Sequence, residues 1–173
     1  RGRYMLTRSD MHRITGAVVG IWLLLLSATT HVRAQAWTSD LSLWTAAVAV
    51  TPQKPRPWIN LGLAREQTGD LPGAFAAQQT AFALAFQPRL TTYQQNFSQM
   101  ASQTNLARLL AEHGQEEAAE RLLTNVVTQV PNFPHASWNL AVLYARTGRC
   151  EQGKPLAAHA KRLDASFSEL SCP

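Results

Sequence analysis

A glycine recurs at three places in the chain with the same surroundings, and this self-similarity restricts the fold more than any other feature. The three positions are Gly69, Gly114 and Gly148. A leucine and then a small residue come shortly before each of them, and another small residue follows: these are Leu61-Gly62 and Ala74, Leu106-Ala107 and Ala119, Leu140-Ala141 and Gly153. Small residues at fixed distances on both sides of a helix-ending glycine are typical of closely packed helical hairpins. The repeat therefore predicts an array of helix–turn–helix units.

The segments around these glycines have the apolar spacing of helices. In residues 105–112 and 117–123, apolar side chains return every three or four positions. Pro52, Pro131 and Pro134 fall between the units, where proline ends one helix or begins the next. No segment has the sustained alternation that is typical of strands, so we expect an all-α fold.

These units resemble the tetratricopeptide repeat, a helix–turn–helix unit of about 34 residues that opens with W-x2-L-G-x2-Y. The motif Trp58-x2-Leu61-Gly62 matches the start of that opening, and Leu140-Ala141-x2-Tyr144 matches its second part. The resemblance covers residues 40–164. It implies a short α-solenoid with three units in residues 55–173, preceded by a junction and a half-unit in residues 34–54.

The first unit departs from the family pattern in two ways. Arg65 and Gln78 stand where the family usually has apolar or aromatic side chains, so this unit is polar where packing is expected. Residues 87–99 form an insert, which we expect to extend a helix or to form a loop. An insert at this point would interrupt the regular stacking of the first two units.

Residues 14–30 carry no charged side chain, and a helix of this length spans about 26 Å of the ~30 Å bilayer core. More positive charge precedes this stretch than follows it, which favours a cytoplasmic N-terminus and a periplasmic or otherwise exported remainder. We therefore expect a basic N-terminus and one membrane span in residues 1–33, with membrane contact through residues 14–32. A secretory signal cleaved at Ala34-Gln35-Ala36 is the alternative. Gly16 and Gly20 have the GxxxG spacing of contacting membrane helices, although we favour coincidence because small residues are common in spans.

The basic character of the chain is concentrated in the same segment. The formal charge is +5 in total, and residues 1–33 contribute five arginines against one aspartate. The rest of the chain is therefore close to neutral. A nucleic-acid-binding domain needs a basic face on its folded part, so we expect no nucleic-acid partner.

An asparagine stands directly before the leucine of each unit, at Asn60, Asn105 and Asn139. In peptide-binding tetratricopeptide repeat proteins, an asparagine at this position lines the concave groove and hydrogen-bonds the ligand's backbone. The resemblance thus implies an asparagine ladder for an extended peptide; the alternative is that these residues only cap or hydrate the helices. Arg56 and His135 stand four residues before Asn60 and Asn139, on the same helix face. The paired Lys and Arg of a carboxylate clamp are missing from the third unit.

Cys150 and Cys172 are too few for a disulfide scaffold or a zinc site. They are either two unrelated thiols or one disulfide, and we expect the disulfide if the domain is exported, because the residues after the last helix can just reach back along it. The common metal, phosphate-binding and nucleophile motifs are missing from the sequence. We therefore expect no catalytic site, no metal and no cofactor.

Residues 33–62 carry a further resemblance, in Arg33-x3-Trp37-x2-Asp40-x2-Leu43-Trp44 and Pro52-x3-Arg56-x3-Asn60. They are similar to the junction between the last membrane helix and the C-terminal repeats of large polytopic proteins related to membrane mannosyltransferases. The leading interpretation is a membrane-tethered module that binds a protein or peptide, or assembles a complex, on the exported side. The alternative is the C-terminal accessory tail of a polytopic membrane glycosyltransferase whose catalytic part lies outside this chain.

Overall fold

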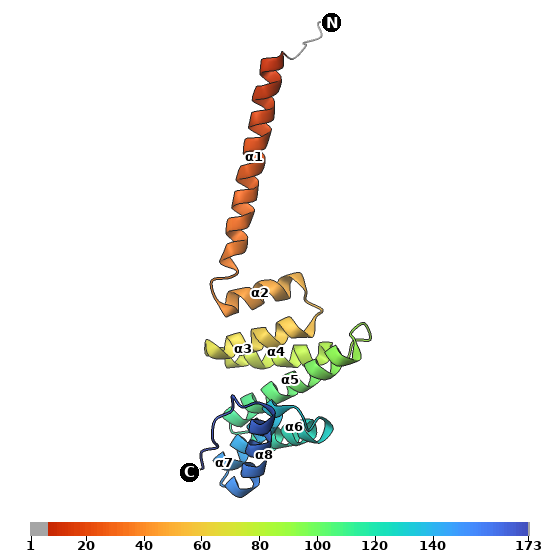
Figure 1. Cartoon of the computed structure of the whole chain (residues 1–173), viewed down its shortest axis with the longest axis vertical. Coiled ribbons are helices and arrows are strands. Elements are labelled where there is room, and N and C mark those ends of the chain that lie inside the picture. The colour runs from red at the N-terminus through yellow and green to blue at the C-terminus, as the bar shows by residue number, and fades with distance from the viewer. Residues whose placement is uncertain (1–6, 173) are drawn as a thin grey trace. The chain divides into compact units, whose positions relative to one another are not determined.

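Residues 7–172, the part that the computed structural model describes, form eight α-helices and no strand (Figure 1). This confirms the all-α prediction. The basic positions Arg1 and Arg3 fall outside the described residues. The chain divides into two compact units, Arg1–Leu43 and Trp44–Pro173.

The first unit contains one long helix, α1 (Arg8–Gln35). It begins at a capping box, in which the Thr7 hydroxyl accepts from the Asp10 backbone N–H at 3.3 Å and the Asp10 carboxylate accepts from the Thr7 N–H at 3.1 Å. The helix has 28 residues, none of them buried, and it is long and apolar enough to cross a membrane. A signal sequence near an N-terminus has the same properties. Nothing in the described structure lies within 4 Å of where a Cβ would stand at Gly16 or Gly20.

The second unit is built from three helical hairpins. Their helices are α3 (Pro55–Gln67) with α4 (Leu71–Leu84), α5 (Thr92–Glu112) with α6 (Glu116–Gln129), and α7 (Pro134–Arg146) with α8 (Cys150–Leu163). Successive hairpins pack through α4 against α5 and α6 against α7, while α3 and α7 each also contact α5 (Figure 1). The first helices of the three hairpins therefore form one layer. Residues 34–54, where a half-unit is expected, contain the helix α2 (Asp40–Val50), which has no buried residue and crosses the boundary between the two units, so the half-unit stays a prediction.

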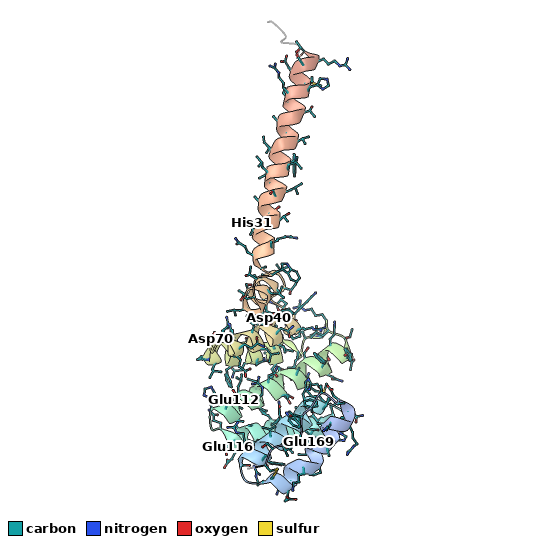
Figure 2. The ribbon with its side chains drawn as sticks, turned by 60° about the vertical axis from the view of Figure 1, so that its left-hand side comes forward. His31, Asp40, Asp70, Glu112, Glu116 and Glu169 are labelled. Atoms are coloured by element: carbon teal, nitrogen blue, oxygen red, sulfur yellow. A yellow bond between two sulfur atoms is a disulfide. The ribbon has the colours of Figure 1, made fainter. Side chains whose placement is uncertain are left out.

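The three recurrent glycines close the three hairpin turns in the same way. Gly69, Gly114 and Gly148 have φ angles of 81°, 74° and 76°, in the left-handed region that glycine adopts without a steric penalty. The residue after each glycine donates its N–H to a carbonyl five positions earlier, at 2.9, 2.9 and 2.7 Å, as in a Schellman motif. Figure 2 labels Asp70 at the first turn and Glu112 and Glu116 on either side of the second.

Small residues let the two helices of each hairpin approach closely. Ala107, Ala119 and Ala141 are fully buried, and a Cβ added at Gly153 would lie 2.8 Å from the carbonyl oxygen of Ala141. Leucines fill the space on either side, and Leu109, Leu123 and Leu143 are among the largest fully buried side chains. The small positions of the sequence repeat are thus contact points between helices.

The polar element predicted in the first unit is a buried glutamine packed on a glycine. Gln78 is 1% exposed, and its Nε2 donates to the Ile59 carbonyl at 3.0 Å. Its side chain fills the space that a Cβ at Gly62 would need, since that atom would lie 2.5 Å from Nε2 and 3.1 Å from Cγ. Arg65, the other departure from the family pattern, donates to the Gly73 carbonyl at 3.1 Å across the turn.

The effect of Gly62→Ala on the free energy of unfolding is expected to change sign with the residue at position 78. In the native chain, Gly62→Ala should lower the free energy of unfolding by about 1–3 kcal/mol, because the new methyl group overpacks against Gln78. In a Gln78→Ala background the same change should raise stability by roughly 0.5–1 kcal/mol, the usual gain of alanine over glycine inside a helix. Urea denaturation of the four variants measures both values. A stability effect of the same sign in both backgrounds would show that Gln78 is not the reason for glycine at position 62.

The insert forms a turn and also lengthens a helix. Residues 85–91 connect α4 to α5, and α5 has 21 residues where α3 and α7 each have 13. Thr91 starts it with a capping box, in which its hydroxyl accepts from the Gln94 N–H at 3.2 Å. The expectation that the insert interrupts the stacking is wrong, since α5 contacts both α3 and α4. The added turns extend α5 at its N-terminus and leave the spacing of its later residues unchanged.

Candidate functional site

One cavity of about 440 Å³ brings together the residues that the sequence singled out on three different helices. It is lined by α3, α5, α7 and the segment after α8. All five predicted groove residues are among its lining residues: Arg56 and Asn60 from α3, Asn105 from α5, and His135 and Asn139 from α7.

The position of the asparagines follows from the leucine beside each of them. Leu61, Leu106 and Leu140 are at most 8% exposed and anchor their helices in the core. An α-helix turns by about 100° per residue, so the preceding residue points to the side of the core, toward the cavity. Asn60, Asn105 and Asn139 are each half-buried. Their amide groups make no hydrogen bond to any described residue, which leaves their donors and acceptors available.

The charges around the cavity are positive. Arg56 and His135 are exposed, and no Asp or Glu is among the described residues that line it. Arg108 also lines the cavity, but it forms an ion pair with Glu66 of α3 and a second one with Glu112 at 3.2 Å. Hydrogen bonding to Glu66 raises the pKa of the Arg108 guanidinium. Arg108 therefore ties α5 to α3, while Arg56 keeps an uncompensated charge at the cavity.

Three phenylalanines that sequence reasoning missed complete the lining: Phe97, Phe133 and Phe167. Phe167 comes from the segment after α8. Its ring stacks on Trp138 at a centroid distance of 5.3 Å and meets the His135 ring edge-on at 5.4 Å. The segment lies outside the repeat pattern, so no family position pointed to it.

A disulfide joins Cys150, at the start of α8, to Cys172, with a Cα–Cα distance of 5.9 Å. Lys161 of α8 forms an ion pair with Glu169 of the segment that follows the helix, and Leu170 of that segment lies against Gly153. These contacts hold the segment along α8 and thereby keep Phe167 at the cavity. Within residues 7–172 no three His, Cys, Asp or Glu side chains are grouped so that they could hold a metal ion.

Comparisons with known proteins agree with the fold of helical hairpins. Residues 104–153, which cover the later part of α5 through the start of α8, match the tetratricopeptide repeat family. No curated protein matches the chain. A solved structure described as the MamA RS-1 ArsTM double mutant is 20% identical, with 81% of this chain and 74% of that chain covered and a TM-score of 0.53. This likeness shows the fold alone.

A second solved structure, YrrB, is described as a TPR protein with an unusual peptide-binding site. It is 13% identical, covers 82% of both chains and has a TM-score of 0.38, too low to carry an argument. The resemblance to mannosyltransferase-related proteins has no counterpart among these matches and stays a prediction. Residues 104–153 therefore carry tetratricopeptide repeat sequence, and the three hairpins with identical turns give the chain the all-α fold that this repeat predicts.

Proposed function

We propose that this chain is a membrane-tethered interaction module whose cavity binds an extended peptide segment of a partner protein. The observation that carries the proposal is the presence of three asparagine amides without internal partners, from three successive hairpins, on one cavity. Each amide offers two donors and an acceptor. An extended backbone presents N–H and C=O groups at regular intervals, so a row of such amides can bind it independently of its sequence.

The remaining lining residues favour a segment with apolar and acidic side chains. Phe97, Phe133 and Phe167 offer aromatic contact area, which contributes strongly to protein interfaces. Arg56 offers a charge with no counterion among the described residues, and the cavity volume of about 440 Å³ lies in the usual range for ligand sites. The test is titration of labelled peptides against the full chain and against a variant in which Asn60, Asn105 and Asn139 are replaced by alanine.

The tether and its side of the membrane are the second part of the proposal. Helix α1 supports a span by its length, its apolar composition and its lack of buried residues. Arg8, Arg13 and His12 before the apolar stretch favour a cytoplasmic N-terminus. The disulfide between Cys150 and Cys172 fits an oxidising compartment, which an exported domain would meet.

The chain in its own membranes is expected to resist extraction by alkaline carbonate. Protease added to the outside of intact spheroplasts or vesicles of known orientation should digest residues 44–173 and leave α1 protected. A chain that is released by carbonate at a lower mass, without residues 1–36, would contradict the tether and favour a cleaved signal. Digestion only after the membrane is broken open would contradict the exported placement.

A further inference from the structure

The loop before α3 and the added turns of α5 enclose a second cavity, of about 660 Å³. Residues 50–56 form one wall. The other wall is formed by Arg89, Leu90, Tyr93, Gln94, Phe97 and Ser98. Arg56 and Phe97 line both this cavity and the one that holds the asparagines, so the two are adjacent. If α5 had the 13 residues of α3 and α7, it would begin at residue 100 and this wall would not exist. The insert therefore builds a feature that the plain repeat lacks.

The second cavity is cationic. Lys54, Arg56 and Arg89 line it, none of them in an ion pair with a described residue, and no Asp or Glu is among its described lining residues. Arg89 is held by neutral groups: its Nε donates to the Gln87 side-chain oxygen at 2.7 Å and its Nη2 to that of Gln53 at 3.1 Å. These bonds fix the guanidinium and leave its charge uncompensated. A positioned guanidinium of this kind forms strong hydrogen bonds with carboxylates.

The same cavity exposes large apolar groups. Tyr93 is 76% exposed and Val50 is 81% exposed. The Tyr93 ring stacks on Phe97, one helical turn further along α5, at a centroid distance of 6.3 Å and an interplanar angle of 21°. Rigid aromatic rings beside arginine are the groups that dominate binding energy in protein interfaces. The wall is thus suited to a ligand that has both a carboxylate and a bulky apolar side chain.

We propose that this second cavity binds an acidic segment carrying a bulky apolar side chain, in the same partner chain whose neighbouring residues occupy the asparagine-lined cavity. The assignment rests on the proposed function of that first cavity. Charge complementarity selects the acidic residues, and the shared wall residues Arg56 and Phe97 place the two cavities side by side, within reach of one extended peptide. An anionic lipid would use the same cations but has no peptide backbone for the asparagine amides of the neighbouring cavity.

The test uses three fluorescein-labelled ten-residue peptides in which every second position is apolar, alternately Leu and Phe. The remaining positions are Asp and Glu in the acidic peptide, Ser in the serine peptide and Lys in the lysine peptide. Fluorescence anisotropy with the full chain in a non-ionic detergent gives their dissociation constants. The acidic peptide should bind at least about tenfold more tightly than the lysine peptide, with a difference that shrinks as salt is raised. Arg89→Glu should weaken the acidic peptide about tenfold and leave the serine peptide unchanged within about twofold.

Arg121→Glu is the matched control, because Arg121 is exposed on α6 and lines neither cavity. It should leave all three affinities unchanged. Tyr93→Ala should weaken the acidic and serine peptides equally, because both contain the apolar residues that its ring contacts.

The outcomes separate the two cavities. If replacement of the three asparagines weakens binding of the acidic peptide and Arg89→Glu does not, the assignment of the second cavity is wrong. The peptide site proposed for the first cavity is then retained. If none of the three peptides binds, both assignments are overturned. Displacement of the acidic peptide by water-soluble short-chain phosphatidylserine, but not by phosphatidylcholine, would assign the cations to lipid and overturn the peptide proposal.

Discussion

Replacing Asn60, Asn105 and Asn139 together by alanine is expected to weaken binding of the acidic peptide about a hundredfold. Each amide that bonds the peptide backbone contributes about 1 kcal/mol net, and about 1.4 kcal/mol corresponds to a tenfold change in affinity. The three amides are half-buried and make no hydrogen bond within the described structure, so their loss leaves no partner unsatisfied. Helix content by circular dichroism and the midpoint of thermal unfolding should therefore stay close to those of the native chain.

The chain contains its own control for this substitution. Asn96, Asn125 and Asn132 are exposed and line neither cavity. Their joint replacement by alanine changes the composition in the same way and should leave peptide affinity unchanged. An equal loss of affinity in both triple variants would point to a general effect on the fold, and no loss in the first variant would remove the asparagine ladder from the binding site.

Reduction of the disulfide between Cys150 and Cys172 is expected to lower the free energy of unfolding by about 3 kcal/mol. The bridge closes a loop across a sequence separation of 22, and loop closure of this length restricts the unfolded chain by about that amount. Urea denaturation of the full chain with and without dithiothreitol measures the difference. The double variant Cys150→Ser/Cys172→Ser should have the same free energy of unfolding as the reduced chain, and dithiothreitol should not change it.

The same reduction should also change the environment of Trp138. Its ring stacks on Phe167, which the bridged segment holds in place, so release of the segment should shift or quench the tryptophan emission. Phe167→Ala with the disulfide intact removes the ring and keeps the bridge, so it should reproduce the spectral change without the full loss of stability. Equal urea midpoints for the oxidised and reduced chains would contradict the stabilising role of the bridge.

The parts of the fold that follow a repeated register could be predicted from the sequence. The glycines Gly69, Gly114 and Gly148 marked the three turns because a positive φ is needed there and few other residues adopt it. The asparagines were found because each precedes a leucine whose burial fixes the rotation of the helix. One buried neighbour was thus enough to orient each of these three polar side chains.

Contacts that lie outside the register could not be predicted in this way. Phe167 reaches the cavity from beyond the last repeat, through a segment whose path is set by a disulfide and an ion pair. Phe97 and Arg89 belong to the insert, whose length alone allowed a loop as well as a helix. The added turns lengthen α5 at its N-terminal end, beside the loop before α3, so its later residues still contact α3 and α4.

The segment after α8 also covers part of the last hairpin. A repeat array grows by stacking each new hairpin on the exposed side of the last one, and it needs an end that no further copy can join. Residues 168–170 lie along α8 beside Ala157, Ala158 and Arg162, where they share a surface depression, and Leu170 packs on Gly153. The single disulfide between Cys150 and Cys172 thus fixes a covering on α8, the side on which a further hairpin would have to pack. Appending a fourth unit after Leu163 would therefore first require removal of this disulfide-bonded segment.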